Sequence, residues 1–125
     1  MINNKKNLWS KFSKKIRESH ADHAGYVICA SCLRMFHWTE TDCGHFLENS
    51  ERKKDFGGNE LWYDKRNFAP QCRECNYFGS AQAKQDWTAR WIDKYGLEAY
   101  KDLHRLKQTP KKWTSEEINE LIDNL

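Results

Sequence analysis

The stretch Gln71–Asn76, QCRECN, carries two cysteines separated by two residues and followed directly by an asparagine. An earlier stretch, Cys29–Cys32 (CASC), has the same spacing. Two such pairs in a short chain provide the four thiolates of a tetrahedral zinc site, each sulfur about 2.3 Å from the metal. A site of this kind is closed and serves the fold rather than chemistry. The sequence therefore predicts structural zinc bound by Cys29, Cys32, Cys72 and Cys75.

A fifth cysteine, Cys43, stands alone. Its position in an extended segment favours a small buried side chain, although it could replace one of the four zinc ligands. His20 and His23 could also bind a metal. At the end of a predicted helix, however, histidines more often complement the helix dipole.

The composition predicts one compact unit with a small core. The chain has 125 residues, of which 38% are hydrophobic and 31% charged, so a bound metal would help to stabilise it. The sequence shows neither a signal-peptide pattern nor an apolar run of the roughly 18 residues that span a membrane. We therefore expect a cytoplasmic protein with no membrane partner, whose paired cysteines bind metal rather than form disulfides.

The formal net charge of +3 is a weak indication of a nucleic-acid partner, and a zinc ion on four thiolates would leave about +1. Basic residues gather near the N-terminus and in a second cluster at positions 52–54. Such patches neutralise phosphates, but solvated surface explains each of them equally well. The basic residues are Lys5, Lys6, Lys11, Lys14, Lys15, Arg17, Arg52, Lys53 and Lys54.

Local patterns predict the elements in the first two thirds of the chain. Residues 5–20 predict an amphipathic helix, because Leu8, Phe12 and Ile16 form one apolar stripe. A short strand leads into the first cysteine pair, and two extended segments, broken near Thr41 and Asp42, follow it. We further expect a loop over 55–60, an extended segment over 61–64 and a helix from residue 73.

The last third is predicted to be helical. Gly96 is a suitable end for a first helix, and a second helix would end before Pro110. Thr114 and Glu117 form a capping-box pattern that opens a third helix. The predicted class is α+β, with a basic helix over 1–24, a zinc-bound core over 25–80 and a helical extension over 81–125. The extension could form a homodimer, but no feature of the sequence decides this.

Three polar residues lie in order around the second cysteine pair: His45 at the end of a predicted strand, then Asn67, then Asn76. This order resembles the HNH endonucleases with their ββα-metal core, in an H-N-N version. The motifs CGHF (43–46), RNFAPQCRECN (66–76) and KYGLEAYKDL (94–103) are further similar to the NinG (Rap) family of phage recombination nucleases. The resemblance covers roughly residues 29 to 106.

The resemblance implies an endonuclease that cuts branched DNA intermediates of recombination, acting in the host cytoplasm. It also implies that Asn67 ties down a loop and so keeps the ring of His45 aimed. The alternatives are a non-enzymatic zinc module that binds nucleic acid or protein, and a sequence-specific HNH enzyme of the homing or restriction kind.

The chemistry of phosphodiester hydrolysis suits these residues. A neutral imidazole, with an ordinary pKa of about 6.5, can deprotonate a water molecule, so His45 is the predicted general base. A divalent cation, Mg²⁺ or Mn²⁺, polarises the phosphate and stabilises the leaving oxygen. The amide oxygen of Asn76 suits such a cation, and the neighbouring cysteine pair would fix its position.

The sequence departs from the HNH pattern at Gly44, where many HNH enzymes carry a second metal ligand directly before the general base. Asp42 and Glu48 are the candidates to replace it. Strand alternation would point Asp42 away from His45 unless a bulge intervenes at Gly44. Around the site, the predicted DNA contacts are Arg52, Lys53, Lys54, Arg66 and Arg73, which would bind phosphates without reading sequence.

Overall fold

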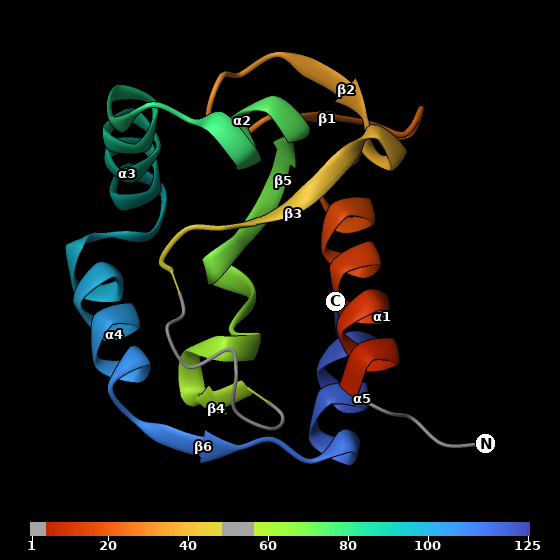
Figure 1. Ribbon diagram of the computed structural model, residues 1–125, viewed down its shortest axis with the longest axis vertical. Coiled ribbons are helices and arrows are strands. Elements are labelled where there is room, and N and C mark those ends of the chain that lie inside the picture. The colour runs from red at the N-terminus through yellow and green to blue at the C-terminus, as the bar shows by residue number, and fades with distance from the viewer. Residues whose placement is uncertain (1–4, 49–56) are drawn as a thin grey trace.

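A computed structural model describes residues 5–48 and 57–125 of the protein (Figure 1). In these ranges the chain forms five α-helices, three short 3₁₀ helices and three two-stranded antiparallel sheets, which confirms the expected α+β class. The α-helices are α1 (Lys5–Ser19), α2 (Arg73–Phe78), α3 (Ala81–Tyr95), α4 (Leu97–Lys107) and α5 (Ser115–Asp123). The strands are β1 (Tyr26–Ile28), β2 (Met35–His37), β3 (Thr41–His45), β4 (Gly57–Asn59), β5 (Phe68–Cys72) and β6 (Pro110–Lys112). The 3₁₀ helices are η1 (Trp38–Glu40), η2 (Glu60–Tyr63) and η3 (Lys65–Asn67).

The pair of strands β3 and β5 forms the centre of the molecule. Their antiparallel register is unbroken, with Thr41 opposite Cys72 and His45 opposite Phe68. Helix α2 begins directly after β5, so the two strands and the helix make a ββα unit with the second cysteine pair at its turn. In Figure 1, α1 and α5 lie on one side of these strands and α3 and α4 on the other.

Two apolar clusters lie on the two sides of this strand pair. In the first, the predicted stripe of α1 packs against β5, η2 and α5, and Leu8, Phe12 and Ile16 are at most 1% exposed, which confirms the amphipathic helix. The members of the first cluster are Leu8, Phe12, Ile16, Tyr63, Phe68, Ile118 and Ile122. The members of the second cluster are Phe46, Leu61, Trp87, Trp91 and Leu103.

Three local predictions were wrong, each because a distant contact decides the conformation. The segment expected to be extended over 61–64 is mostly the 3₁₀ helix η2, which sends Leu61 into the second cluster and Tyr63 into the first. Residues 57–59, expected in a loop, form β4 and pair with β6 from beyond α4. The break between the extended segments is η1 rather than Thr41 and Asp42, which belong to β3.

The predicted helix ends and cap of the C-terminal third are confirmed, but the strand β6 between α4 and α5 was not predicted. Gly96 ends α3 with a φ of +97°, a conformation that glycine adopts without steric cost. Helix α4 stops at Lys107, before Pro110. Thr114 and Glu117 form both hydrogen bonds of the capping box at the start of α5.

Candidate functional site

The four paired cysteines converge near one end of the β3–β5 pair. Their Sγ atoms all lie within 4.8 Å of one another, and those of Cys32 and Cys72 are 3.9 Å apart. Four sulfurs placed tetrahedrally at about 2.3 Å from a zinc ion would be separated by about 3.8 Å. The four side chains are therefore close enough to hold a metal ion, and this donor set is consistent with structural zinc.

The first cysteine pair is shaped by a tight turn between β1 and β2. The backbone N–H of Leu33 donates to the carbonyl oxygen of Cys29 at 2.9 Å. Leu33 has a φ of +66°, a left-handed conformation that is costly for a residue with a branched side chain. The backbone N–H of Cys72 donates to Cys29 Sγ at 3.3 Å and so links the two pairs directly.

Arg34 supports the thiolates from outside. Its guanidinium donates to Cys32 Sγ at 3.2 Å and to Cys72 Sγ at 3.7 Å, and it pairs with Glu74 at 2.8 Å. Burial opposes ionisation of Cys32, but the hydrogen bonds from Arg34 outweigh it and lower the pKa of this thiol to about 6. The sequence prediction did not include Arg34, although a basic residue two positions after a cysteine pair is a usable signal.

The pKa values of the second cysteine pair shift in the opposite direction. Burial is the main cause that raises the pKa values of Cys72 and Cys75, and the neighbouring Cys29 adds to it. A cluster that resists ionisation in this way needs a positive charge among the sulfurs to keep all four as thiolates, as a divalent cation provides.

His45 lies at the end of β3 with its ring against two aromatic side chains. The indole of Trp9, from α1, stacks on it with centroids 5.6 Å apart, and Phe68 meets it edge-on at 5.0 Å. The ring is half-buried. Trp9 was not among the predicted site residues, because no local pattern connects α1 with β3.

His45 and Asn76 line the same cavity. This cavity has a volume of about 340 Å³, is open to solvent and lies beside the second cysteine pair. Glu48, Gln71 and Lys84 also line it. The structure thus brings together the residues predicted as general base and as metal ligand, and adds Gln71 and Lys84, which the sequence prediction missed.

Asn67 is fully buried and holds the chain just beyond His45. Its Oδ1 accepts a hydrogen bond from the backbone N–H of Leu47 at 2.7 Å, and its Nδ2 donates to the carbonyl oxygen of Leu47 at 3.1 Å. Its own carbonyl oxygen accepts from the N–H of Phe46 at 2.8 Å. These three bonds fix the two residues that follow His45.

Asn76 contacts the predicted second ligand Asp42. Its Nδ2 donates to Asp42 Oδ2 at 3.1 Å, and Arg73 approaches the other carboxylate oxygen at 3.5 Å. No bulge interrupts β3, so Asp42 lies on the opposite face of the strand from His45, as alternation predicts. The carboxylate is therefore next to Asn76 rather than next to the imidazole.

The space beside Gly44 is filled by Gln71. A Cβ atom at position 44 would come within 2.2 Å of Gln71 Oε1, which leaves no room for a side chain. Gln71 is held in place by donating to Ser31 Oγ at 2.7 Å. Packing against Gln71 therefore explains why position 44 is a glycine.

Of the five predicted DNA contacts, the structure describes only Arg66 and Arg73, and their surroundings differ. Arg52, Lys53 and Lys54 lie outside the described residues. Arg73 is 64% exposed beside Asp42. Arg66 is bound by Asp64 at 2.7 Å and by Asp102 at 3.2 Å, so it links η3 to α4. A DNA contact by Arg66 stays a prediction.

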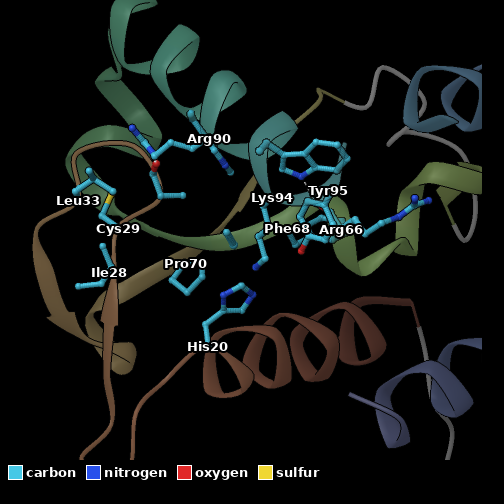
Figure 2. A pocket seen from close by; sticks show the side chains of 14 residues that line it. His20, Ile28, Cys29, Leu33, Arg66, Phe68, Pro70, Arg90, Lys94 and Tyr95 are labelled. Carbon is cyan, nitrogen blue, oxygen red and sulfur yellow. Dashed lines mark hydrogen bonds between the residues drawn. The ribbon is translucent and has the colours of Figure 1, made fainter. Parts of the chain in front are cut away.

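A second cavity, of about 200 Å³, lies beside β5, with Phe68 and Pro70 in its wall (Figure 2). Arg66 lines it together with His20, from the end of α1, and with Arg90 and Lys94 of α3. Arg90 donates to the carbonyl oxygens of Ala30 and Ser31, so it fastens α3 to the loop between the first two cysteines. Burial, with a smaller contribution from Lys94, lowers the pKa of His20.

Within residues 5–48 and 57–125, only the four cysteines form a group of three or more His, Cys, Asp or Glu side chains close enough together to hold a metal ion. A metal near His45 would therefore rely on amide oxygens, water and substrate as well as on carboxylates.

None of the helices in the described part of the chain combines the length and apolar character that a membrane span requires.

These features define a small α+β protein in which four cysteines, close enough to hold a metal ion, lie next to a polar cavity. The family model for the bacteriophage lambda NinG protein matches residues 3–125, and the chain belongs to this family. Membership of this phage family indicates a role related to phage recombination. A search of the curated proteins gave no match, and a search of the solved structures gave none.

Proposed function

We propose that this protein is a metal-dependent DNA endonuclease of the HNH class that hydrolyses phosphodiester bonds in branched DNA. The observation that carries the proposal is the cavity shared by His45 of β3 and Asn76 of α2, next to the four cysteines. An imidazole on the first strand of a ββα unit and a carboxamide on its helix is the arrangement that the resemblance to HNH enzymes implies. The phage family is consistent with a recombination intermediate as the substrate.

His45 acts as the general base in this proposal. A neutral imidazole accepts the proton of the attacking water near neutral pH. Trp9 and Phe68 limit the orientations of the ring, and Asn67 holds the chain that follows it. Such restraint matters because a misplacement of about 1 Å can reduce a catalysed rate roughly 100-fold.

Asn76 holds the catalytic divalent cation, Mg²⁺ or Mn²⁺, through its side-chain oxygen. Glu48 lines the same cavity and Asp42 contacts Asn76, so each is a candidate for a further ligand. Mg²⁺ keeps several of its waters, so one or two oxygen ligands from the protein are sufficient. When bound, the cation polarises the phosphate and stabilises the leaving 3′ oxygen.

Gln71 compensates for the missing side chain at Gly44. Its Oε1 lies in the space that a residue-44 side chain would enter, and Gln71 lines the same cavity. The hydrogen bond to Ser31 fixes the amide nitrogen and leaves this oxygen beside Gly44. An amide oxygen therefore stands in for the ligand that many HNH enzymes carry there.

The four cysteines bind structural zinc, which sets the position of Asn76 because Cys75 directly precedes it. Arg73 and Lys84 neutralise DNA phosphates near the cavity. Lys84 lies over the rings of Phe46 and Trp87, 4.6 Å and 5.0 Å from their centroids. Burial lowers the pKa of Lys84, and the negative charge of Glu48 opposes this effect.

The test is a cleavage assay with purified protein on supercoiled plasmid, linear duplex and a labelled four-way junction. Each reaction contains Mg²⁺, Mn²⁺ or EDTA, and retained zinc is quantified in parallel. The variants are His45→Ala, Asn76→Ala and, as a matched control away from the cavity, His104→Ala on the exposed side of α4. We expect divalent-dependent cutting of the junction by wild type and His104→Ala, and none by the first two variants.

Full activity of a folded, zinc-loaded His45→Ala variant would contradict the catalytic assignment. DNA binding without cleavage under any metal would instead support the non-enzymatic zinc module. Discrete cuts in linear duplex that depend on sequence would favour an HNH enzyme of the homing or restriction kind.

A further inference from the structure

Helix α2 ends in two successive aromatic side chains that the rest of the described fold leaves in solvent. Tyr77 is 70% exposed and Phe78 is 83% exposed, and their ring centroids lie 6.3 Å apart. Large apolar side chains are normally withdrawn from water, so two adjacent ones mark a contact surface.

This aromatic pair stands on a rigid support. Cys72 and Cys75 anchor the start of α2 in the four-cysteine cluster. Arg34 pairs with Glu74 of α2 at 2.8 Å and donates to Cys32 Sγ at 3.2 Å, so it connects α2 to the first cysteine pair. The chain then turns sharply at Gly79, where a Cβ would come within 2.5 Å of the carbonyl oxygen of Cys75. Because these contacts hold α2 in place, the fold itself keeps the rings of Tyr77 and Phe78 exposed.

The pair adjoins the candidate catalytic cavity. Tyr77 lines that cavity together with His45 and Asn76. Phe78 lines a neighbouring hollow of about 540 Å³, which it shares with Arg34. Arg34, 57% exposed, lies beside Phe78 in this hollow and pairs with Glu74, and Arg73, 64% exposed and paired with Asp42, is on the same helix as the two rings.

We propose that Tyr77 and Phe78 stack on unpaired bases beside the scissile bond and thereby select branched over fully paired DNA. This inference rests on the proposed function. In a continuous duplex the faces of the bases are covered by their neighbours, whereas junctions and flaps expose them. Aromatic side chains bind exposed bases without regard to sequence, and the surrounding arginines supply the salt-dependent phosphate contacts.

The experiment measures binding in a His45→Ala background, so that the DNA stays intact. A flap carries 2-aminopurine at the first unpaired position next to the branch, a four-way junction carries it in the base pair at the branch point, and a duplex of the same sequence is the reference. Tyr77→Ala, Phe78→Ala and the double variant are compared with Tyr77→Phe, which keeps the ring. Leu97→Ala serves as the control, because Leu97 is also exposed (52%) but lies at the start of α4.

We expect quenching of 2-aminopurine by the background protein and by Tyr77→Phe. Loss of each ring should weaken binding to branched DNA about 5-fold or more and leave binding to duplex unchanged. Unchanged affinity and quenching in the double variant, with normal zinc content, would overturn the inference. Conversion of a dimer to a monomer by the double variant, with DNA binding retained, would also overturn it and assign the surface to a second copy of the chain.

Cleavage by protein with an intact His45 separates this inference from the proposed function. Equal cutting of the junction by wild type and by the double variant would keep the endonuclease and reject the stacking role. Binding and quenching without any cleavage would reject the endonuclease and support the stacking role.

Discussion

The indole of Trp9 lies nearly parallel to the imidazole of His45, with centroids 5.6 Å apart and an interplanar angle of 18°. Trp9 belongs to α1, so a helix outside the ββα unit holds the candidate catalytic ring. Phe68 contacts both rings, at 5.5 Å from Trp9 and 5.0 Å from His45. The orientation of His45 therefore depends on the packing of the N-terminal helix.

Replacing Trp9 with alanine should release the imidazole. We expect kcat for DNA cleavage to fall by up to about 100-fold because the base is no longer aimed, with a smaller change in KM. Trp9→Phe keeps an aromatic face and should retain most of the activity. The measurement is kcat against pH, well below the melting temperature of each variant. A variant with a lower melting temperature and an unchanged pH profile would show that Trp9 serves stability alone.

Asn67→Ala should destabilise the protein and reduce cleavage together. The change leaves the N–H and carbonyl oxygen of Leu47 without their partner, at about 1–3 kcal/mol for each group that stays buried. Asn67→Asp can still accept from the N–H but cannot donate, so its loss should be intermediate. Urea unfolding and cleavage rates provide the measurement. An Asn67→Ala variant as stable as wild type would rule out the positioning role.

Metal removal should unfold the region around the cysteine pairs, because the two pairs hold β1 against β5 in a protein with a small core.

Arg34→Ala should weaken zinc binding about 10- to 100-fold, since it removes the hydrogen bonds to Cys32 and Cys72. Arg105→Ala, on α4, is the matched control. Competition with a zinc-sensitive dye measures the affinity. Equal affinity in the two variants would contradict a supporting role for Arg34.

Gly44→Ala should destabilise the protein by about 1–3 kcal/mol, because the new Cβ would overlap Gln71 Oε1. In the double variant with Gln71→Ala the contact with Oε1 disappears but the Cβ of residue 71, 2.9 Å away, remains, so the second change should recover only part of the loss. A double-mutant cycle based on urea unfolding measures the coupling between the two positions. Strictly additive effects would show that the two side chains do not compete for the same space.

Cys43 should make the free energy of unfolding fall as the pH becomes alkaline. Burial raises the pKa of its thiol from 9.0 to about 12, so folding favours the neutral thiol. This contribution is fully present below about pH 9 and is lost as the pH rises toward 12. The free energy of unfolding of wild type should therefore fall more between pH 9 and 11 than that of Cys43→Ala. Parallel pH curves for the two proteins would disprove the shift.

Short-range patterns predicted much of this fold. The stripe of α1, the end of α3 at Gly96 and the capping box of α5 each depend on residues within a few positions of one another. The strand β4 was missed because its partner β6 lies more than 50 residues later, and only that pairing makes residues 57–59 extended.

The sequence by itself determined the two cysteine pairs as candidate metal ligands and the order of His45, Asn67 and Asn76, because spacing and residue type carry that information. Only the tertiary structure decided that Trp9 stacks on His45, that Gln71 fills the space beside Gly44 and that Asp42 meets Asn76. The reason is physical: these contacts join side chains from separate elements, and their geometry is set by how α1, β3, β5 and α2 pack together.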